Sequence, residues 1–275
     1  MWSLSEWRRQ RILAQHPVTP DVWHNVRQHL SILDGLNDEQ DKWLRDSSVL
    51  FLQAKHLTPM PGVELTEEGR LLLAAQAQLP LLNLGDLDWY QGFHEIVLYP
   101  DDFVSPQRHR DSSGVEHEWE GHHSGEAWQH GPVVLAWPGV LASGGWEGYN
   151  LVIHELAHKL DMLNGAANGM PPLHSSMHVS DWTQAMQQAY DHLNHYLDHH
   201  NPDHAPIDPY AAENPAEFFA VTSEYFFSAP DLLNHAYPLV YQQLSLFYRQ
   251  DTLARLKQLQ SEHPEYRAQP LHGQT

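Results

Sequence analysis

The segment from residue 151 to 162 carries two histidines and a glutamate at a spacing that suits metal chemistry. His154 and His158 lie four residues apart, and Glu155 directly follows the first of them. On an α-helix, side chains four residues apart project from the same face. In an H-E-x-x-H pattern, the two imidazoles bind a Zn²⁺ ion and the carboxylate takes a proton from metal-bound water. The spacing therefore predicts a zinc hydrolase, in particular a peptidase.

The residues around this motif favour a buried helix. Most of its neighbours are apolar, and neither Pro nor Gly interrupts the chain between Tyr149 and Asn164. Asn164 and Gly165 then supply a typical helix stop. In a chain with 22 histidines, the pattern is expected by chance roughly 0.1 times. The alternative is a core helix with two incidental histidines.

A catalytic zinc ion needs a third protein ligand and leaves its fourth position to water. The chain has no cysteine, so the third ligand must be His, Asp or Glu. Asn214 and Pro215 predict a helix start, and Glu217 is the only charged residue from there to Ser223. A carboxylate in such an apolar run needs a partner, and a metal ion would be one. The alternative is a capping box in which Glu217 returns to the Asn214 amide.

Further polar residues near these positions are candidates for a supporting role. Glu224 lies two turns beyond Glu217 on the same helical face and suits an acceptor behind a metal ligand. Asp161 follows His158 by three residues and is a second candidate for holding an imidazole N–H, or else a carboxylate on the helix surface. The histidines within 192–204 show no regular ligand spacing, so we expect solvated loop residues there.

Composition narrows the class of protein. A length of 275 residues fits one large domain or two modest ones. The net charge of −20 disfavours direct binding to DNA or RNA. No apolar run approaches the ~20 residues that span a bilayer, and the first residues lack the apolar region of a signal peptide. We therefore expect a cytoplasmic protein without membrane contact.

The pattern along the chain predicts a predominantly helical α+β fold with a small sheet. Helical spacing dominates residues 3–95, and the proposed division is a helical N-terminal region at 1–94 packed on a catalytic core at 95–275. Strands are expected at 95–100 and 132–138, with a long loop or irregular hairpin between them. The second strand has a proline at each end, which favours an edge strand that receives an extended substrate; the alternative is an ordinary sheet strand. Later helices are expected over 182–197, 214–227 and about 231–260.

Several of these segments together resemble the Mlc titration factor A family. The resemblance rests on the motif with Asp161 and Asn164-Gly165, on Gly125-Glu-Ala-Trp and Gly131-Pro-Val-Val-Leu, and on Asn214-Pro-Ala-Glu217-Phe-Phe. It covers nearly the whole chain. It implies a gluzincin-type, zincin-like zinc metallopeptidase whose core is similar to the catalytic domain of anthrax lethal factor. It also implies a cytosolic protein with aminopeptidase-like activity on small peptide substrates. Such a protein binds the transcriptional repressor Mlc and so modulates expression of the glucose phosphotransferase system.

The resemblance also implies roles for single residues. His154, His158 and Glu217 would be the ligands of one zinc ion, with Glu155 as general base. Tyr210 looks like the family's active-site tyrosine, whose phenol would bind the oxyanion; by itself it is equally well a packed aromatic residue.

The family has a further histidine near the metal, for which His117 is the best match and His122 and His123 are rivals. A fourth protein ligand would fill the position that water needs, and the site would then be latent until the loop moved. In one departure from thermolysin-like gluzincins, Val221 stands where those enzymes place an aspartate, so Glu224 or Asp161 must serve instead. Two alternatives remain open: a protein that mainly sequesters the repressor, and a structural metal.

Overall fold

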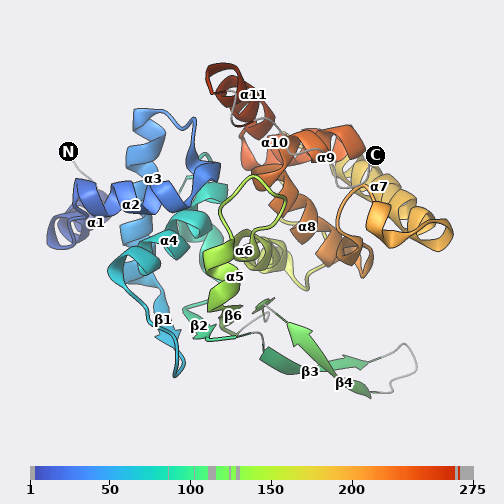
Figure 1. The fold of residues 1–275 in the computed structure, drawn as a ribbon, viewed down its shortest axis with the longest axis horizontal. Coiled ribbons are helices and arrows are strands. Elements are labelled where there is room, and N and C mark those ends of the chain that lie inside the picture. The colour runs from blue at the N-terminus through green and yellow to red at the C-terminus, as the bar shows by residue number, and fades with distance from the viewer. Residues whose placement is uncertain are drawn as a thin grey trace.

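The structure is a computed structural model of the chain. It describes residues 4–263 and 266, apart from 86, 102, 111–115, 124 and 128–130. For residues 4–5, 87, 103–110, 116–123 and 126–127 it describes the backbone alone. Within these residues the fold is a mostly helical α+β arrangement with a small sheet, as the sequence predicts (Figure 1).

Four helices come first in the chain: α1 (Leu4–Gln15), α2 (Pro20–His29), α3 (Asp38–Ala54) and α4 (Glu67–Gln78). Their starts follow from capping residues. Asn37 and Gln40 form a reciprocal capping box at α3, and the Thr66 hydroxyl accepts the Gly69 N–H at α4. The helical prediction for this region is confirmed, except that His56–Pro59 forms a strand, β1, which the sequence pattern did not reveal. Only Leu57 of that strand is buried, so no alternating pattern marked it.

The main sheet has four strands: β1, β2 (Glu95–Tyr99), β5 (Gly125–Ala127) and β6 (Val133–Ala136). Their order is β1-β2-β6-β5, with β1, β2 and β6 parallel and β5 antiparallel to β6. The expectation of an edge strand at 132–138 is therefore wrong, because β6 lies between β2 and β5. The strand also ends earlier than expected, since α5 (Trp137–Ala142) begins there with Pro138 in its first turn.

The segment between β2 and β5 forms a regular antiparallel hairpin. Strands β3 (Phe103–Arg110) and β4 (Glu116–His123) pair along their whole length, from Phe103 opposite His123 to Arg110 opposite Glu116. The expected long loop or irregular hairpin is thus a continuous two-stranded ladder. It lies at the lower edge of the view in Figure 1.

The rest of the chain is helical: α6 (Leu151–Asp161), α7 (Val179–His199), α8 (Pro215–Ser228), α9 (Pro230–Ala236), α10 (Pro238–Tyr248) and α11 (Thr252–Glu262). The single helical stretch expected over 231–260 is three helices. Pro230 and Pro238 each occupy a first helical position, where the missing N–H costs nothing, and so each opens a new helix.

Helix α6 lies at the centre of the fold. All eleven of its residues are buried, and it packs against α8, α4 and strands β5 and β6. One hydrophobic cluster joins Trp23 of α2 to Tyr248 of α10 and includes most apolar residues of α6. In the described residues, no helix combines the length and apolar character that crossing a membrane requires. The division at residue 94 stays a prediction.

Candidate metal centre

Helix α6 presents the two histidines of the motif on one face. The Asn150 side chain caps this helix by accepting the Ile153 N–H, and Gly165, at φ 144°, ends the turn that follows it. His154 and His158 are 8% and 7% exposed, and their Nε2 atoms lie 3.3 Å apart. The helix predicted from the sequence therefore places both imidazoles side by side in a largely dry environment.

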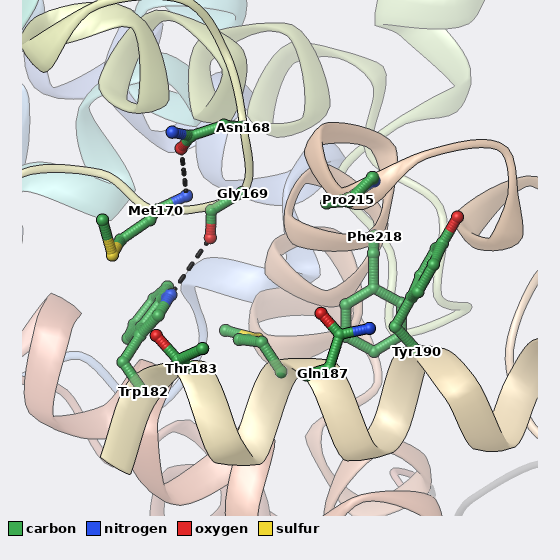
Figure 2. A pocket seen from close by; sticks show the side chains of 10 residues that line it. Asn168, Gly169, Met170, Trp182, Thr183, Gln187, Tyr190, Pro215 and Phe218 are labelled. Carbon is green, nitrogen blue, oxygen red and sulfur yellow. Dashed lines mark hydrogen bonds between the residues drawn. The ribbon is translucent and has the colours of Figure 1, made fainter. Parts of the chain in front are cut away.

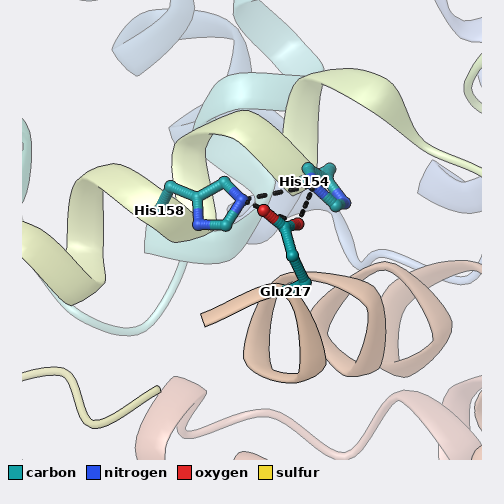
Figure 3. A group of neighbouring side chains, drawn as sticks. All are labelled: His154, His158 and Glu217. Carbon is teal, nitrogen blue, oxygen red and sulfur yellow. Dashed lines mark hydrogen bonds and ion pairs between the residues drawn. The ribbon is translucent and has the colours of Figure 1, made fainter. Parts of the chain in front are cut away.

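Helix α8 brings the carboxylate of Glu217 to these imidazoles (Figure 3). The Asn214 side chain caps α8 by accepting the N–H groups of Ala216 and Glu217. The Glu217 side chain turns away from this cap, and its Oε2 lies 3.1 Å from His154 Nε2 and 3.2 Å from His158 Nε2. The capping-box alternative is therefore not what the structure shows.

The spacing of these three atoms fits a single metal ion. In a tetrahedral zinc site with bonds of about 2.0–2.1 Å, neighbouring ligand atoms lie about 3.3 Å apart. The three observed separations are 3.1, 3.2 and 3.3 Å. Within the part of the chain that the structure describes, this is the one group of three or more His, Cys, Asp or Glu side chains that converges in this way.

The charges of the cluster support the same conclusion. Burial alone would raise the pKa of Glu217, but hydrogen bonds to the two imidazoles hold that pKa well below its usual range. Burial works to lower the pKa of His154, yet the nearby Glu224 and Glu217 carboxylates raise it well above its usual range. The pocket thus stabilises positive charge between the imidazoles and Glu217, where a divalent cation would lie.

Glu224 supports the cluster from behind. Its Oε1 accepts a hydrogen bond from His154 Nδ1 at 2.5 Å, and its Oε2 accepts the Asn150 N–H at 2.9 Å. A carboxylate on Nδ1 fixes the imidazole tautomer, so that Nε2 is left to bind a metal. Of the two acceptors considered from the sequence, Glu224 occupies this position.

Asp161 has a different role. Its Oδ2 accepts the N–H groups of Asn168 at 2.8 Å and Gly169 at 2.7 Å, and so fixes the loop after α6. Both of these hydrogen bonds go to the loop backbone rather than to an imidazole. Gly169 has φ +80°, and a Cβ there would lie 2.4 Å from the carbonyl oxygen of Pro215, the first residue of α8. The loop therefore packs directly on the helix that carries Glu217.

A small cavity of about 90 Å³ lies next to this loop (Figure 2). It is bounded by the loop, by one face of α7 and by the first turn of α8. Trp182 of α7 closes one end, with its indole N–H donated to the Gly169 carbonyl at 3.0 Å. None of the metal-centre residues lines this cavity, so it is separate from the centre.

Glu155 lies against the short edge strand β5. It is 4% exposed, and its Oε2 has no hydrogen-bond partner in the described structure. Burial raises the pKa of Glu155 to about 7, against the lowering effect of the neighbouring imidazoles. A Cβ at Gly125 of β5 would lie 2.3 Å from Glu155 Oε1, so any larger residue there would displace the Glu155 carboxylate. Sequence reasoning noted Gly125 in a motif but missed this reason for it.

Tyr210 lies beside the cluster, at the position expected from the sequence. It belongs to the short 3₁₀ helix of Pro209–Ala212, which Asp208 caps by accepting the Tyr210 N–H at 2.9 Å. Its ring centroid is 6.0 Å from that of His154. Burial, and then the charge of Glu217, raises the pKa of the Tyr210 phenol. The hydroxyl is therefore protonated at neutral pH and able to donate a hydrogen bond.

His117 belongs to β4 and is opposite His109 in the hairpin ladder. Its side chain is outside the described part of the structure, and the same holds for His122 and His123. A fourth ligand from this segment stays a prediction.

Comparison with known proteins defines the class. The sequence model of the family described as glucose-regulated metallo-peptidase M90 matches residues 4–249. The chain belongs to this family of metallopeptidases.

Individual relatives narrow the comparison further. The chain is 43% identical over 235 residues to Mlc titration factor A of Yersinia enterocolitica serotype O:8, a match that covers 85% of this chain and 87% of the relative. It is 42% identical over 236 residues to the proteins of the same name from Yersinia pestis strain Pestoides F and Yersinia pseudotuberculosis serotype O:1b, with 86% of each chain covered. The resemblance inferred from the motifs is thereby confirmed.

Proposed function

We propose that the chain is a zinc-dependent, aminopeptidase-like metallopeptidase in which His154, His158 and Glu217 bind one Zn²⁺ ion. The observation that carries this proposal is the convergence of three ligand atoms within 4.8 Å, at separations that match tetrahedral zinc. The donor set of two imidazoles and one glutamate is one that catalytic zinc sites use, with the fourth position open for water. Membership of a metallopeptidase family also supports the proposed metallopeptidase function.

Different residues of the chain have different roles in the proposed peptide hydrolysis. When bound, zinc would supply Lewis-acid activation of water and of the scissile carbonyl. Glu155 accepts the proton of the attacking water and passes it to the leaving amine. The protonated phenol of Tyr210 donates a hydrogen bond to the oxyanion.

The substrate backbone would lie along β5. Among the described residues this strand pairs only with β6, so its other edge offers N–H and C=O groups to an extended peptide. Because β5 also contacts α6, a peptide bound there lies beside Glu155. The substrate-binding edge assigned to 132–138 from the sequence therefore moves to Gly125–Ala127.

The decisive experiment combines metal analysis with a peptide panel. The purified protein should contain about one zinc per chain, and should cleave chromogenic peptides with free N-termini. The Glu155→Gln variant should retain zinc and lose turnover. Normal peptidase activity in that variant would contradict the mechanism.

A second function concerns the repressor Mlc. The relatives carry the name Mlc titration factor A, and we propose that this chain also binds Mlc, in the cytoplasm where a transcriptional repressor acts. Through Mlc it would modulate the glucose phosphotransferase system. With a charge of −20, the chain is expected to contact the repressor rather than DNA. A Glu155→Gln protein that still binds purified Mlc would separate this function from catalysis.

A further inference from the structure

A cavity of about 370 Å³ opens beside the metal centre, and its lining is strongly acidic. His154, Glu155 and Tyr210 form one part of it. Among the described residues, four carboxylates line it, from Glu147, Glu155, Asp208 and Glu224, and none of the described lining residues is a lysine or an arginine. Such a cavity favours a ligand that carries positive charge close to the reacting groups.

Two of these carboxylates already have assigned roles. Glu224 is bonded to His154 and to the Asn150 N–H, and Glu155 is the proposed base. Glu155 Oε2 is buried at this end of the cavity and lacks a protein partner among the described residues, which leaves it for a ligand. Glu147 and Asp208, both exposed, remain to interact with the rest of that ligand.

Asp208 is held in a fixed position. Its Oδ1 accepts the Tyr210 N–H at 2.9 Å, and its own N–H is donated to the Tyr225 hydroxyl at 3.2 Å. The Tyr225 ring is packed in turn on Gly148, where φ is +81° and a Cβ would lie 3.3 Å from the ring. The loop that carries Glu147 and the segment that carries Asp208 therefore both contact Tyr225, which lines the same cavity as the two carboxylates.

We propose that Asp208 and Glu147 bind the α-ammonium group of the peptide substrate. This inference rests on the proposed peptidase function and names the residues that would make it an aminopeptidase. An ammonium group placed between these carboxylates puts the carbonyl of the first residue toward His154, Glu155 and Tyr210, which line the same cavity. A peptide with a blocked N-terminus would bring no positive charge to either carboxylate.

The test compares leucine p-nitroanilide with its N-acetyl derivative. In Asp208→Asn, the amide oxygen can still cap the Tyr210 turn while the charge is lost; Glu147→Gln removes the second charge without touching that turn. Since an exposed ion pair contributes a factor of up to about five in affinity, we expect kcat/KM for the free amine to fall about fivefold in each variant. Cleavage of the acetylated substrate should not change.

A matched control is Glu213→Gln. Glu213 is exposed and adjacent to the same segment, but it does not line the cavity, so its loss should leave the preference for a free amine intact. Zinc content and thermal unfolding would verify that each variant is folded.

The outcomes separate the two proposals. If the wild-type protein contains zinc but cleaves both substrates equally, aminopeptidase specificity fails. If it prefers the free amine and the double variant keeps that preference in full, the assignment of Asp208 and Glu147 is overturned while the peptidase stands.

Discussion

Helices α6 and α7 each carry a pair of histidines four residues apart, yet the two pairs occupy very different surroundings. His154 and His158 on α6 are buried, with ring centroids 5.0 Å apart. His195 and His199 on α7 are exposed, with ring centroids 4.3 Å apart. His195 lies in the helix expected over 182–197, and His199 belongs to the same helix because α7 extends two residues beyond that expected end.

The two pairs differ in the side chains that other segments place next to them. Glu217 approaches the α6 pair from another helix, and Glu224 fixes the tautomer of His154. On α7, His199 Nδ1 instead contacts the backbone carbonyl of its own neighbour, His195. Histidine spacing on a helix is therefore insufficient by itself. A metal centre also needs a third donor and an outer acceptor, which come from distant segments.

The largest expected effect is the loss of a ligand from the buried pair. His154→Ala should bind no zinc and should show no peptidase activity above background, because two ligands cannot hold the ion in a catalytic site. Metal analysis and a peptide assay would measure this. His195→Ala is the matched control and should behave as wild type. Equal loss of zinc in both variants would contradict the claim that the α6 histidines bind the metal and the α7 histidines do not.

Glu155→Gln should separate binding from catalysis. General acid–base catalysis contributes about 10²–10⁴-fold, so kcat should fall within that range while zinc remains at one per chain. Glu213→Gln, a nearby exposed substitution of the same kind, should leave kcat unchanged. Loss of zinc in Glu155→Gln would show that the carboxylate is needed for the metal rather than for proton transfer.

Gly125→Ala tests how closely β5 must approach the base. The added methyl group would collide with the Glu155 carboxylate, and since a misplacement of about 1 Å costs about 100-fold in rate, we expect a loss in kcat of that order with zinc retained. Steady-state kinetics would measure it. Gly92→Ala is the control, because a Cβ at Gly92 meets no atom within 4 Å. Unchanged kcat in Gly125→Ala would show that Glu155 has room to move.

Glu224→Gln should weaken metal binding without abolishing it. Outer acceptors on metal-bound histidines typically contribute 10–100-fold in affinity, so a competition titration with a zinc chelator should reveal a shift in that range. An unchanged zinc Kd would mean that Glu224 orients only the backbone of α6.

Zinc removal should lower stability by a smaller, measurable amount. An ion present at 100 times its Kd stabilises the folded state by about 2.7 kcal/mol, which for a chain of this size corresponds to a rise in Tm of several degrees. His195→Ala should show the same rise in a thermal melt with and without chelator. His154→Ala should show none; a full shift in that variant would place the stabilising zinc elsewhere.

The metal centre was more predictable than the sheet. The apolar run around Glu217 made a buried charge visible, and the spacing of the α6 histidines fixed their common face. The sheet depends on short, distant pairings: β1 has four residues and pairs with β2, 39 positions later, and β5 has only three. Segments this short carry too little periodicity to identify strand order, and the prolines at 132 and 138, which favoured an edge strand, instead precede β6 and open α5. Likewise nothing local showed that the N-H of Asp208 meets Tyr225.

The ties around α6 have a consequence for how the ion is loaded. Asp161 accepts a hydrogen bond from the loop that packs on Pro215, at the C-terminal end of α6. Glu224 accepts the Asn150 N–H at the N-terminal end of the same helix. These protein-to-protein bonds hold α6 and α8 in register independently of any cation. We therefore expect the metal site to be preformed in the apoprotein, so that zinc binds and dissociates without refolding of the chain. The concentration of free zinc would then determine the fraction of the enzyme that is active.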